Sequence, residues 1–407
     1  MRNQIIFECN NQLVAIFNHT QEIFKHKSNW QLQKEYWLLK LLFSKRILNI
    51  DASLIEKILK SNFPIHWFIG PSVYKKFCSG ETIESALEVV QHNWNQKIYS
   101  YIGYAVEGNQ DEESFDKNFN QILKEIDHAN SHQGLKFIVF KPTSLGRSEL
   151  FELKQKNHLF NDNQLFEWDR VKQRFDQIAE KCFQKKAFLL IDAEETWIQQ
   201  AIDDLTIELI KKHNKKEPIV FITVQMYRKD GFKKLKNLRD FAQSNNRIVG
   251  VKLVRGAYIE KENQRALAHG IESPICASKN ETDTNFHRGI QFIMENLDGM
   301  SLFLGTHNEK STQYCIDLMS QCNIDKQHPK IWFSQLYGMS EHISFGLASQ
   351  GYKTVKYIPY GPLKKIIPYL LRRAQENSSV IGQTSRDIYL IKQELKRRKN
   401  EKSKSMS

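Results

Sequence analysis

Eight short apolar runs, each followed by a longer helical segment, limit the possible folds of this chain more than any other feature. The runs are Ile98–Val106, Phe137–Phe140, Phe188–Ile191, Ile219–Val224, Ile248–Val254, Leu302–Leu304, Ile331–Leu336 and Val355–Ile358. They are almost continuously apolar and rich in Val, Ile and Phe, which is typical of parallel strands buried on both faces. The segments with helical periodicity are Phe115–Ala129, Phe160–Cys182, Ile198–Lys212, Phe232–Gln243, Asn285–Glu295, Glu309–Met319 and Ile343–Gln350. Because no G-x-G-x-x-G sequence occurs, we predict an α/β fold of the (βα)8 TIM-barrel type rather than an open Rossmann sheet.

The sequence divides into three parts. Residues 1–95 are predicted to form an N-terminal helical arm, in which Thr82 is a candidate helix N-cap. Residues 96–390 contain the strand–helix alternations and are the predicted barrel. Residues 391–407 carry seven Lys or Arg against two Glu, and we expect them to be a disordered basic tail.

Composition excludes several classes of protein. Six cysteines are scattered without a C-x-x-C pair or a Cys/His cluster, which predicts free thiols in a reducing compartment and no metal site. No signal peptide opens the chain, and no stretch reaches the ~18 apolar residues that span a bilayer. We therefore expect a soluble, cytoplasmic protein. A net charge of +13 is typical of proteins that bind anionic lipid or nucleic acid. No nucleic-acid motif accompanies this charge, so we expect no nucleic-acid partner.

Polar residues lie at, or directly after, the ends of seven predicted strands. They are Lys141, Asp192, Gln225, Arg255, His307 with Asn308, Gln335 and Tyr357. In a TIM barrel the carboxyl ends of all strands meet at one rim, where active sites are built. Each residue alone has an ordinary structural explanation, since a lone histidine is usually hydrogen-bonded and an aspartate often caps a helix. Seven of them at the same end of successive strands predict a site at that rim.

A helical pattern over Leu363–Ser379 follows the last strand. On it Tyr369, Arg372, Arg373 and Glu376 are spaced so that their side chains lie near one another. Two adjacent guanidinium groups beside tyrosines suit a small carboxylate ligand, because the planar fork binds it bidentately. Spacing alone favours a surface helix with one ion pair, whereas the strand-end residues favour the ligand site.

Five motifs, in order, resemble those of the proline dehydrogenase family. They are Leu190–Glu195 (LIDAEE), Lys252–Tyr258 (KLVRGAY), Thr306–Asn308 (THN), Gln335–Met339 (QLYGM), and Tyr357–Pro362 (YIPYGP) with Tyr369–Arg373 (YLLRR). The resemblance covers at least residues 75–390 and is to the monofunctional enzymes, since the chain has no room for an attached aldehyde dehydrogenase.

The resemblance implies a distorted (βα)8 barrel that binds FAD at its C-terminal face. Such an enzyme oxidises L-proline to Δ1-pyrroline-5-carboxylate by hydride transfer to flavin N5 and passes the electrons to a membrane quinone, with a peripheral contact at the inner membrane. The carboxylate would be held by Lys141, Arg372 and Arg373, with Asp192 paired to Lys141. The substrate ring would be enclosed by Tyr357, Tyr369, Ala257 and Leu336. The FAD would lie along Ala193, Gln225, Lys252, Arg255, Gly256, Ala257, Tyr258, Lys279, Thr282, His307, Asn308 and Glu376.

These residue types suit the implied reaction. Hydride leaves the ring carbon beside a neutral nitrogen, so the site needs rigid anchoring of the carboxylate rather than a strong acid or a nucleophile. Lys252 and Arg255 would supply fixed positive charge for the reduced flavin.

The chain departs from the family at three positions. Gly103 stands where an acidic residue is usual, and Ala277 stands where some members have threonine. Pro142 replaces a common aliphatic residue and restricts Lys141 to extended geometry. Glu107 is kept and is a candidate partner for Arg372 when substrate is absent.

Two other functions remain open on the sequence. Lys141 or Lys252 at a strand end, near Asp192, is also typical of a Schiff-base lyase such as a class I aldolase. A degenerate barrel that binds a ligand without catalysis is the other alternative. A flavin-like visible spectrum would distinguish the dehydrogenase from both.

Overall fold

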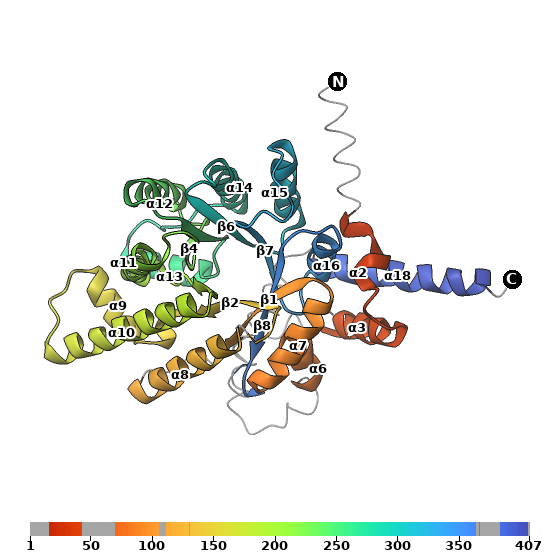
Figure 1. Cartoon of the computed structure of the whole chain (residues 1–407), viewed down its shortest axis with the longest axis horizontal. Coiled ribbons are helices and arrows are strands. Elements are labelled where there is room, and N and C mark those ends of the chain that lie inside the picture. Colours follow the sequence, from red (N-terminus) through yellow and green to blue (C-terminus); the bar gives the residue numbers. More distant parts are fainter. Residues whose placement is uncertain are drawn as a thin grey trace.

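The computed structural model describes residues 16–42, 70–105, 111–129, 131–363, 366 and 383–405. Its centre is a closed barrel in which eight parallel strands are hydrogen-bonded in sequence order (Figure 1). The strands are β1 (Ile98–Tyr104), β2 (Leu135–Phe140), β3 (Phe188–Ile191), β4 (Val220–Gln225), β5 (Val249–Val254), β6 (Met300–Gly305), β7 (Ile331–Leu336) and β8 (Thr354–Tyr360). Every predicted strand has its counterpart, so the predicted (βα)8 barrel is confirmed.

Helices connect the strands and cover the outside of the barrel. They are α8 (Glu112–His128), α9 (Ser148–Gln155), α10 (Asp162–Gln184), α11 (Thr196–His213), α12 (Gly231–Asn245), α13 (Ile259–His269), α14 (Lys279–Glu295), α15 (Glu309–Gln321) and α16 (Glu341–Ser349). A short 3-10 helix, η3 (Pro142–Ser144), follows β2. Lys141 before it has φ −91° and ψ 129°, the extended geometry that Pro142 predicts.

Aromatic side chains fill the barrel interior. Tyr101, Phe137, Phe221, Phe303 and Trp332 form one packed cluster, and none is more than 4% exposed. Side chains of successive strand residues point to opposite faces, so the intervening residues face the surrounding helices. Because these rings fill the interior, a ligand of the barrel would bind at its mouth, where the strands end.

The N-terminal arm packs against the barrel through helices. α2 (Thr20–Phe24), α3 (Asn29–Leu42) and α6 (Gly70–Phe77) belong to the described part of this arm. α7 (Ile83–Asn95) contacts β1, and the Thr82 side chain accepts a hydrogen bond from the amide of Ser85, as an N-cap does.

Buried ion pairs connect the arm to α16. Lys27 and Lys76 pair with Glu35 on α3 and with Glu341 on α16. The pKa of Glu341 is well below its usual range, since the charges of Lys27 and Lys76 outweigh the opposing effect of burial. The carboxylate therefore stays ionised and holds two arm elements against the barrel.

The expectation of a disordered basic tail is wrong for residues 391–405. These residues belong to α18 (Gln383–Ser405), which lies beside α2, α3 and α16 at one side of the barrel (Figure 1). Leu390 and Ile391 are 1% exposed and pack on the arm. Glu394 is fully buried and pairs with Arg397 and Arg398. Charge counting missed this packing because it did not consider which face of the helix is apolar.

Candidate active site

An ion pair at the barrel mouth joins β5 to the end of β3. Lys252 Nζ donates to Asp192 Oδ1 at 2.6 Å and lies 5.7 Å from the ring centroid of Tyr101. Burial would lower the pKa of Lys252, but the charge of Asp192 outweighs it, so the pKa is raised and the amine is cationic at neutral pH. The resemblance predicts that Asp192 pairs with Lys141. In the structure Asp192 pairs with Lys252. A pair between Asp192 and Lys141 stays a prediction.

Arg255, at the end of β5, is fixed by three neighbouring side chains. Its guanidinium donates to Asp283 at 2.8 Å, to Thr306 Oγ1 at 2.9 Å and to Ser311 Oγ at 2.8 Å. Lys279 also pairs with Asp283, at 2.5 Å. The structure therefore brings two predicted cofactor residues, Arg255 and Lys279, together through one carboxylate. Both side chains carry positive charge to the same part of the rim.

Hydrogen bonds join the loops after β2 and β3 to each other and to the end of β4. Glu194 accepts from the amide N and Oγ1 of Thr143, at 2.8 and 2.7 Å. Gln225 Nε2 donates to the Glu194 carbonyl at 2.8 Å. Burial raises the pKa of Glu194, while the charge of Lys141 acts in the opposite direction, so Lys141 lies near this carboxyl. Gln225 thus positions the loop that carries Asp192.

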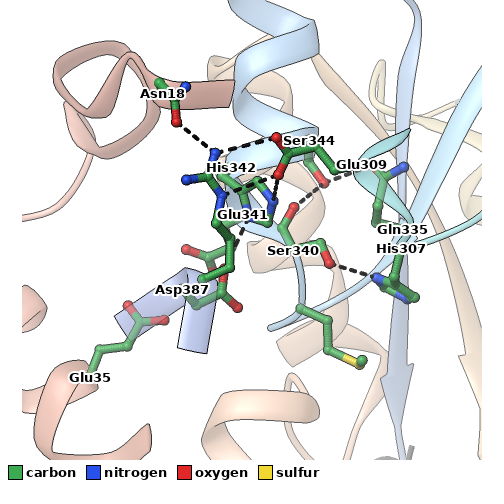
Figure 2. A network of polar contacts seen from close by, with 12 residues as sticks. Asn18, Glu35, His307, Glu309, Gln335, Ser340, Glu341, His342, Ser344 and Asp387 are labelled. Carbon is green, nitrogen blue, oxygen red and sulfur yellow. Dashed lines mark hydrogen bonds and ion pairs between the residues drawn. The ribbon is translucent and has the colours of Figure 1, made fainter. Parts of the chain in front are cut away.

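His307 and Asn308 lie between β6 and α15. Figure 2 shows His307 beside Ser340. His307 Nδ1 is 3.0 Å from Ser340 Oγ, and His307 Nε2 accepts from the Leu336 amide at 3.4 Å. Because an amide can only donate, we assign the imidazole proton to Nδ1, which donates to Ser340. Asn308 caps α15 by accepting from the Ser311 amide at 2.9 Å. The loops after β6 and β7 therefore hold each other in place.

Tyr357 and Leu336, which are predicted to enclose a substrate ring, are partners in the β7–β8 register. The Tyr357 ring lies 4.9 Å from that of Tyr101. Lys356 is 2% exposed, and its amine donates to the carbonyls of Leu336 and Met339 at 3.3 and 2.8 Å. Burial lowers the pKa of Lys356 to about 8. Lys356 thus fastens the loop after β7 to β8 and fixes the backbone of the predicted ring wall.

The remaining predicted residues differ in what the structure says of them. Ala257 is exposed at the rim, beside Tyr258, and Thr282 lies in the first turn of α14. Ala193 follows Asp192 in the loop after β3. Four residues from the predicted terminal helix and Glu107 lie outside the described residues, and their roles stay predictions: Tyr369, Arg372, Arg373, Glu376 and Glu107.

Sequence reasoning missed several residues that position the site. Asp283 is four residues after Lys279 on one helix, a spacing that signals an ion pair. Lys356 is a lysine within an apolar strand, which signals a specific partner. Ser340 gave no signal, because its contact with His307 depends on how two distant loops meet.

The residues at the rim fit an anionic dinucleotide cofactor. Lys252 and Arg255 carry positive charge, which suits a phosphate or a reduced flavin. Gly256 has φ +128°, a conformation that favours glycine, and a Cβ there would collide with the Tyr227 ring. Within the described residues, the buried Tyr227 hydroxyl has no hydrogen-bond partner, which leaves a donor beside the Gly256 loop.

The chain forms a closed (βα)8 barrel, and cationic side chains lie at the carboxyl ends of its strands. This arrangement is typical of the enzymes built on such barrels. The model of the family described as proline dehydrogenase matches residues 86–386, which is most of the chain. The chain therefore belongs to the proline dehydrogenase family and is an oxidoreductase of that class.

Two relatives and one solved structure show the extent of the similarity. The carbapenem antibiotics biosynthesis protein CarD of Pectobacterium carotovorum subsp. carotovorum is 32% identical over 322 residues, which cover 79% of this chain and 83% of the relative. The mitochondrial proline dehydrogenase 1 of Dictyostelium discoideum is 31% identical over 433 residues, which cover 93% of this chain and 74% of the relative.

The solved structure is proline utilization A from Bdellovibrio bacteriovorus, inactivated by N-propargylglycine. It superposes with a TM-score of 0.68 at 21% identity and covers 91% of this chain. This chain spans 42% of that protein, and at this identity the similarity supports the fold.

Proposed function

We propose that the protein is a flavin-dependent dehydrogenase that oxidises L-proline to Δ1-pyrroline-5-carboxylate. The observation that carries the proposal is the fixed pair of cations, Lys252 and Arg255, at the mouth of a barrel that belongs to the proline dehydrogenase family. Asp192 neutralises Lys252 in part, and Asp283 does the same for Arg255. Both cations are therefore held in place before any ligand binds.

The rim residues would hold FAD through the charges of Lys252 and Arg255. Bound FAD supplies the hydride acceptor, its N5 atom. Arg255 and Lys279 lie on one side of the rim, and Lys252 lies nearer the barrel axis, above Tyr101. The role of the chain is to place positive charge where the reduced cofactor becomes anionic.

The substrate would be held at its carboxylate and enclosed at its ring. In the proposal Lys141, Arg372 and Arg373 bind the carboxylate. Tyr357 and Leu336, with Tyr369 and Ala257, form the ring wall. Bidentate binding restricts the orientation of the ring, so the carbon next to nitrogen is held in the geometry that hydride transfer needs. The nitrogen has to be neutral so that its lone pair can form the C=N bond as hydride leaves the adjacent ring carbon. No strong acid is therefore required beside it.

We further propose that a membrane quinone accepts the electrons. In this proposal the protein is cytoplasmic and contacts the membrane peripherally. Trp30 and Trp37 on α3 are 68% and 62% exposed, with Lys34 and Lys40 over their rings at 5.2 and 5.0 Å. Exposed tryptophan beside lysine is typical of a membrane interface. Adjacent α18 carries eight Lys or Arg against three Asp or Glu, which would attract anionic lipid.

None of the helices in the described ranges combines the length and the apolar composition that crossing a bilayer requires. The proposed contact is with the surface of the membrane, through α3 and α18.

Reconstitution with FAD, followed by a proline-dependent dye-reduction assay, tests the proposed function. We expect a yellow protein that reduces the dye only when L-proline is present. A protein that stays colourless after incubation with FAD would refute the proposal. Borohydride trapping of a substrate on Lys141 or Lys252 would instead support the Schiff-base lyase.

A further inference from the structure

Gly103 lies at the barrel mouth, where any side chain would collide with Tyr357. It is an interior position of β1, two residues beyond Tyr101, whose ring packs inside the barrel. A Cβ on Gly103 would lie 2.6 Å from Tyr357 Oη, 2.8 Å from Cε2 and 3.1 Å from Cζ, whereas ordinary contacts begin at 3.4 Å. The Tyr357 phenol therefore occupies the space that a side chain at position 103 would fill.

The backbone does not require glycine at this position. Gly103 pairs with Pro359 in the regular β1–β8 register, and it is not among the described glycines with positive φ. Alanine adopts such an extended conformation readily. The three atoms nearest to the missing Cβ all belong to Tyr357. The need for glycine is therefore steric, and the closest contacts come from the Tyr357 ring.

We infer that Gly103 is a specificity-determining residue that sets the size of ring the substrate site accepts. The inference rests on the proposed function, in which Tyr357 encloses the substrate ring. Because position 103 has no side chain, the Tyr357 phenol packs directly on the backbone of β1. A Cβ, which points to the barrel interior, would push the phenol by about 0.6–0.8 Å towards the barrel axis and into the ring site. Gly103 thus widens the site and admits cyclic imino acids larger than a site with alanine would.

The test compares L-proline with its six-membered analogue, L-piperidine-2-carboxylate, in the FAD-loaded protein. Gly103→Ala should lower kcat/KM for proline by about fivefold or more, because overpacking moves the ring wall. The six-membered ring should lose about threefold more than proline, because it needs the space that the phenol enters. In a Tyr357→Ser background, where no phenol can be displaced, Gly103→Ala should change neither value by more than about twofold.

Gly250 offers a matched control. A Cβ there would lie 2.6 Å from the ring of Phe221, which is the same kind of contact, but it lies below Lys252 on β5. Gly250→Ala should lower Tm as Gly103→Ala does and leave the ratio of the two kcat/KM values unchanged. Calorimetric binding of cyclopentanecarboxylate and cyclohexanecarboxylate provides a readout apart from turnover, and Gly103→Ala should weaken the larger ring more.

The outcomes separate this inference from the function on which it rests. If wild type oxidises proline and Gly103→Ala leaves the ratio unchanged, the inference is wrong and the function stands. If wild type neither oxidises proline nor binds either carboxylate, the function and the inference both fail. If Gly103→Ala does not fold, Gly103→Ala/Tyr357→Ser decides: recovery of folding supports the steric origin, and its absence overturns it.

Discussion

His342 joins the barrel to the C-terminal helix through two carboxylates, and its substitution should destabilise the protein in a pH-dependent way. The imidazole is 2% exposed and lies 3.3 Å from Glu309 on α15 and 3.0 Å from Asp387 on α18 (Figure 2). Burial would lower the pKa of His342, but its bonds to Asp387 and Glu309 outweigh burial, so the pKa is raised. Arg386 also pairs with Glu309.

The size of the effect follows from these contacts. His342→Gln removes two charge-assisted hydrogen bonds, each worth about 1.5–3 kcal/mol. Arg386 still compensates Glu309, and the two carboxylate side chains are 30% and 22% exposed, so water replaces part of the loss. We expect the free energy of unfolding to fall by about 2–4 kcal/mol.

The pH dependence has a definite sign. A folded pKa above the unfolded value of about 6.5 gives stability that is fully present below that value and is lost as pH rises through the folded pKa. The difference between wild type and His342→Gln should therefore be largest near about pH 6 and should shrink towards about pH 9.5.

Urea unfolding at both pH values measures this difference, and His213→Gln is the matched control. His213 is also buried, but burial, reinforced by the charge of Lys212, lowers its pKa. Its contribution should therefore be fully present above about pH 6.5 and should not shrink as pH rises. A His342→Gln cost that is equal at both pH values would refute the reasoning about the two carboxylates.

Three further predictions concern the proposed site and the membrane contact. Replacing Arg372 or Arg373 by Met should weaken the apparent affinity for proline about tenfold or more while FAD stays bound, since a charge-assisted hydrogen bond is lost. If both variants keep wild-type steady-state kinetics, the carboxylate site lies elsewhere. The kcat/KM for proline should exceed that for 4-hydroxyproline by about ten- to a hundredfold, because a hydroxyl beside Tyr357 would be buried without full hydrogen bonding. Tyr357→Ser should lower the ratio of the two kcat/KM values, and an unchanged ratio would show that Tyr357 does not select between these substrates. Deleting residues 391–407 should reduce the fraction of protein that floats with anionic liposomes. An equal fraction would contradict the proposed lipid contact.

The barrel was predictable because its signal is local and repeated. Runs such as Phe188–Ile191 and Ile331–Leu336 match the observed strands at both ends, since apolar strands buried on both faces contrast with their polar flanks. The N-cap at Thr82 and the extended geometry of Lys141 were predictable for the same reason. Each depends on one residue and its immediate neighbours.

The pairings within the site were not predictable from one sequence. Asp192 and Lys252 are 60 residues apart, and nothing in either motif says that they form an ion pair. In α18 Leu390 and Ile391 pack on the arm, a contact that a charge count of residues 391–407 does not reveal. The steric reason for Gly103 appears only when the Tyr357 ring is placed beside it.

The central claim is that the barrel mouth around Lys252 and Arg255 holds a flavin that L-proline reduces. Anaerobic mixing of the FAD-loaded protein with L-proline tests it most directly. We predict that the visible flavin absorbance is lost on mixing with L-proline, and that it is retained when cyclopentanecarboxylate, which has no ring nitrogen, is added instead. A flavin band that persists in excess L-proline would contradict the account.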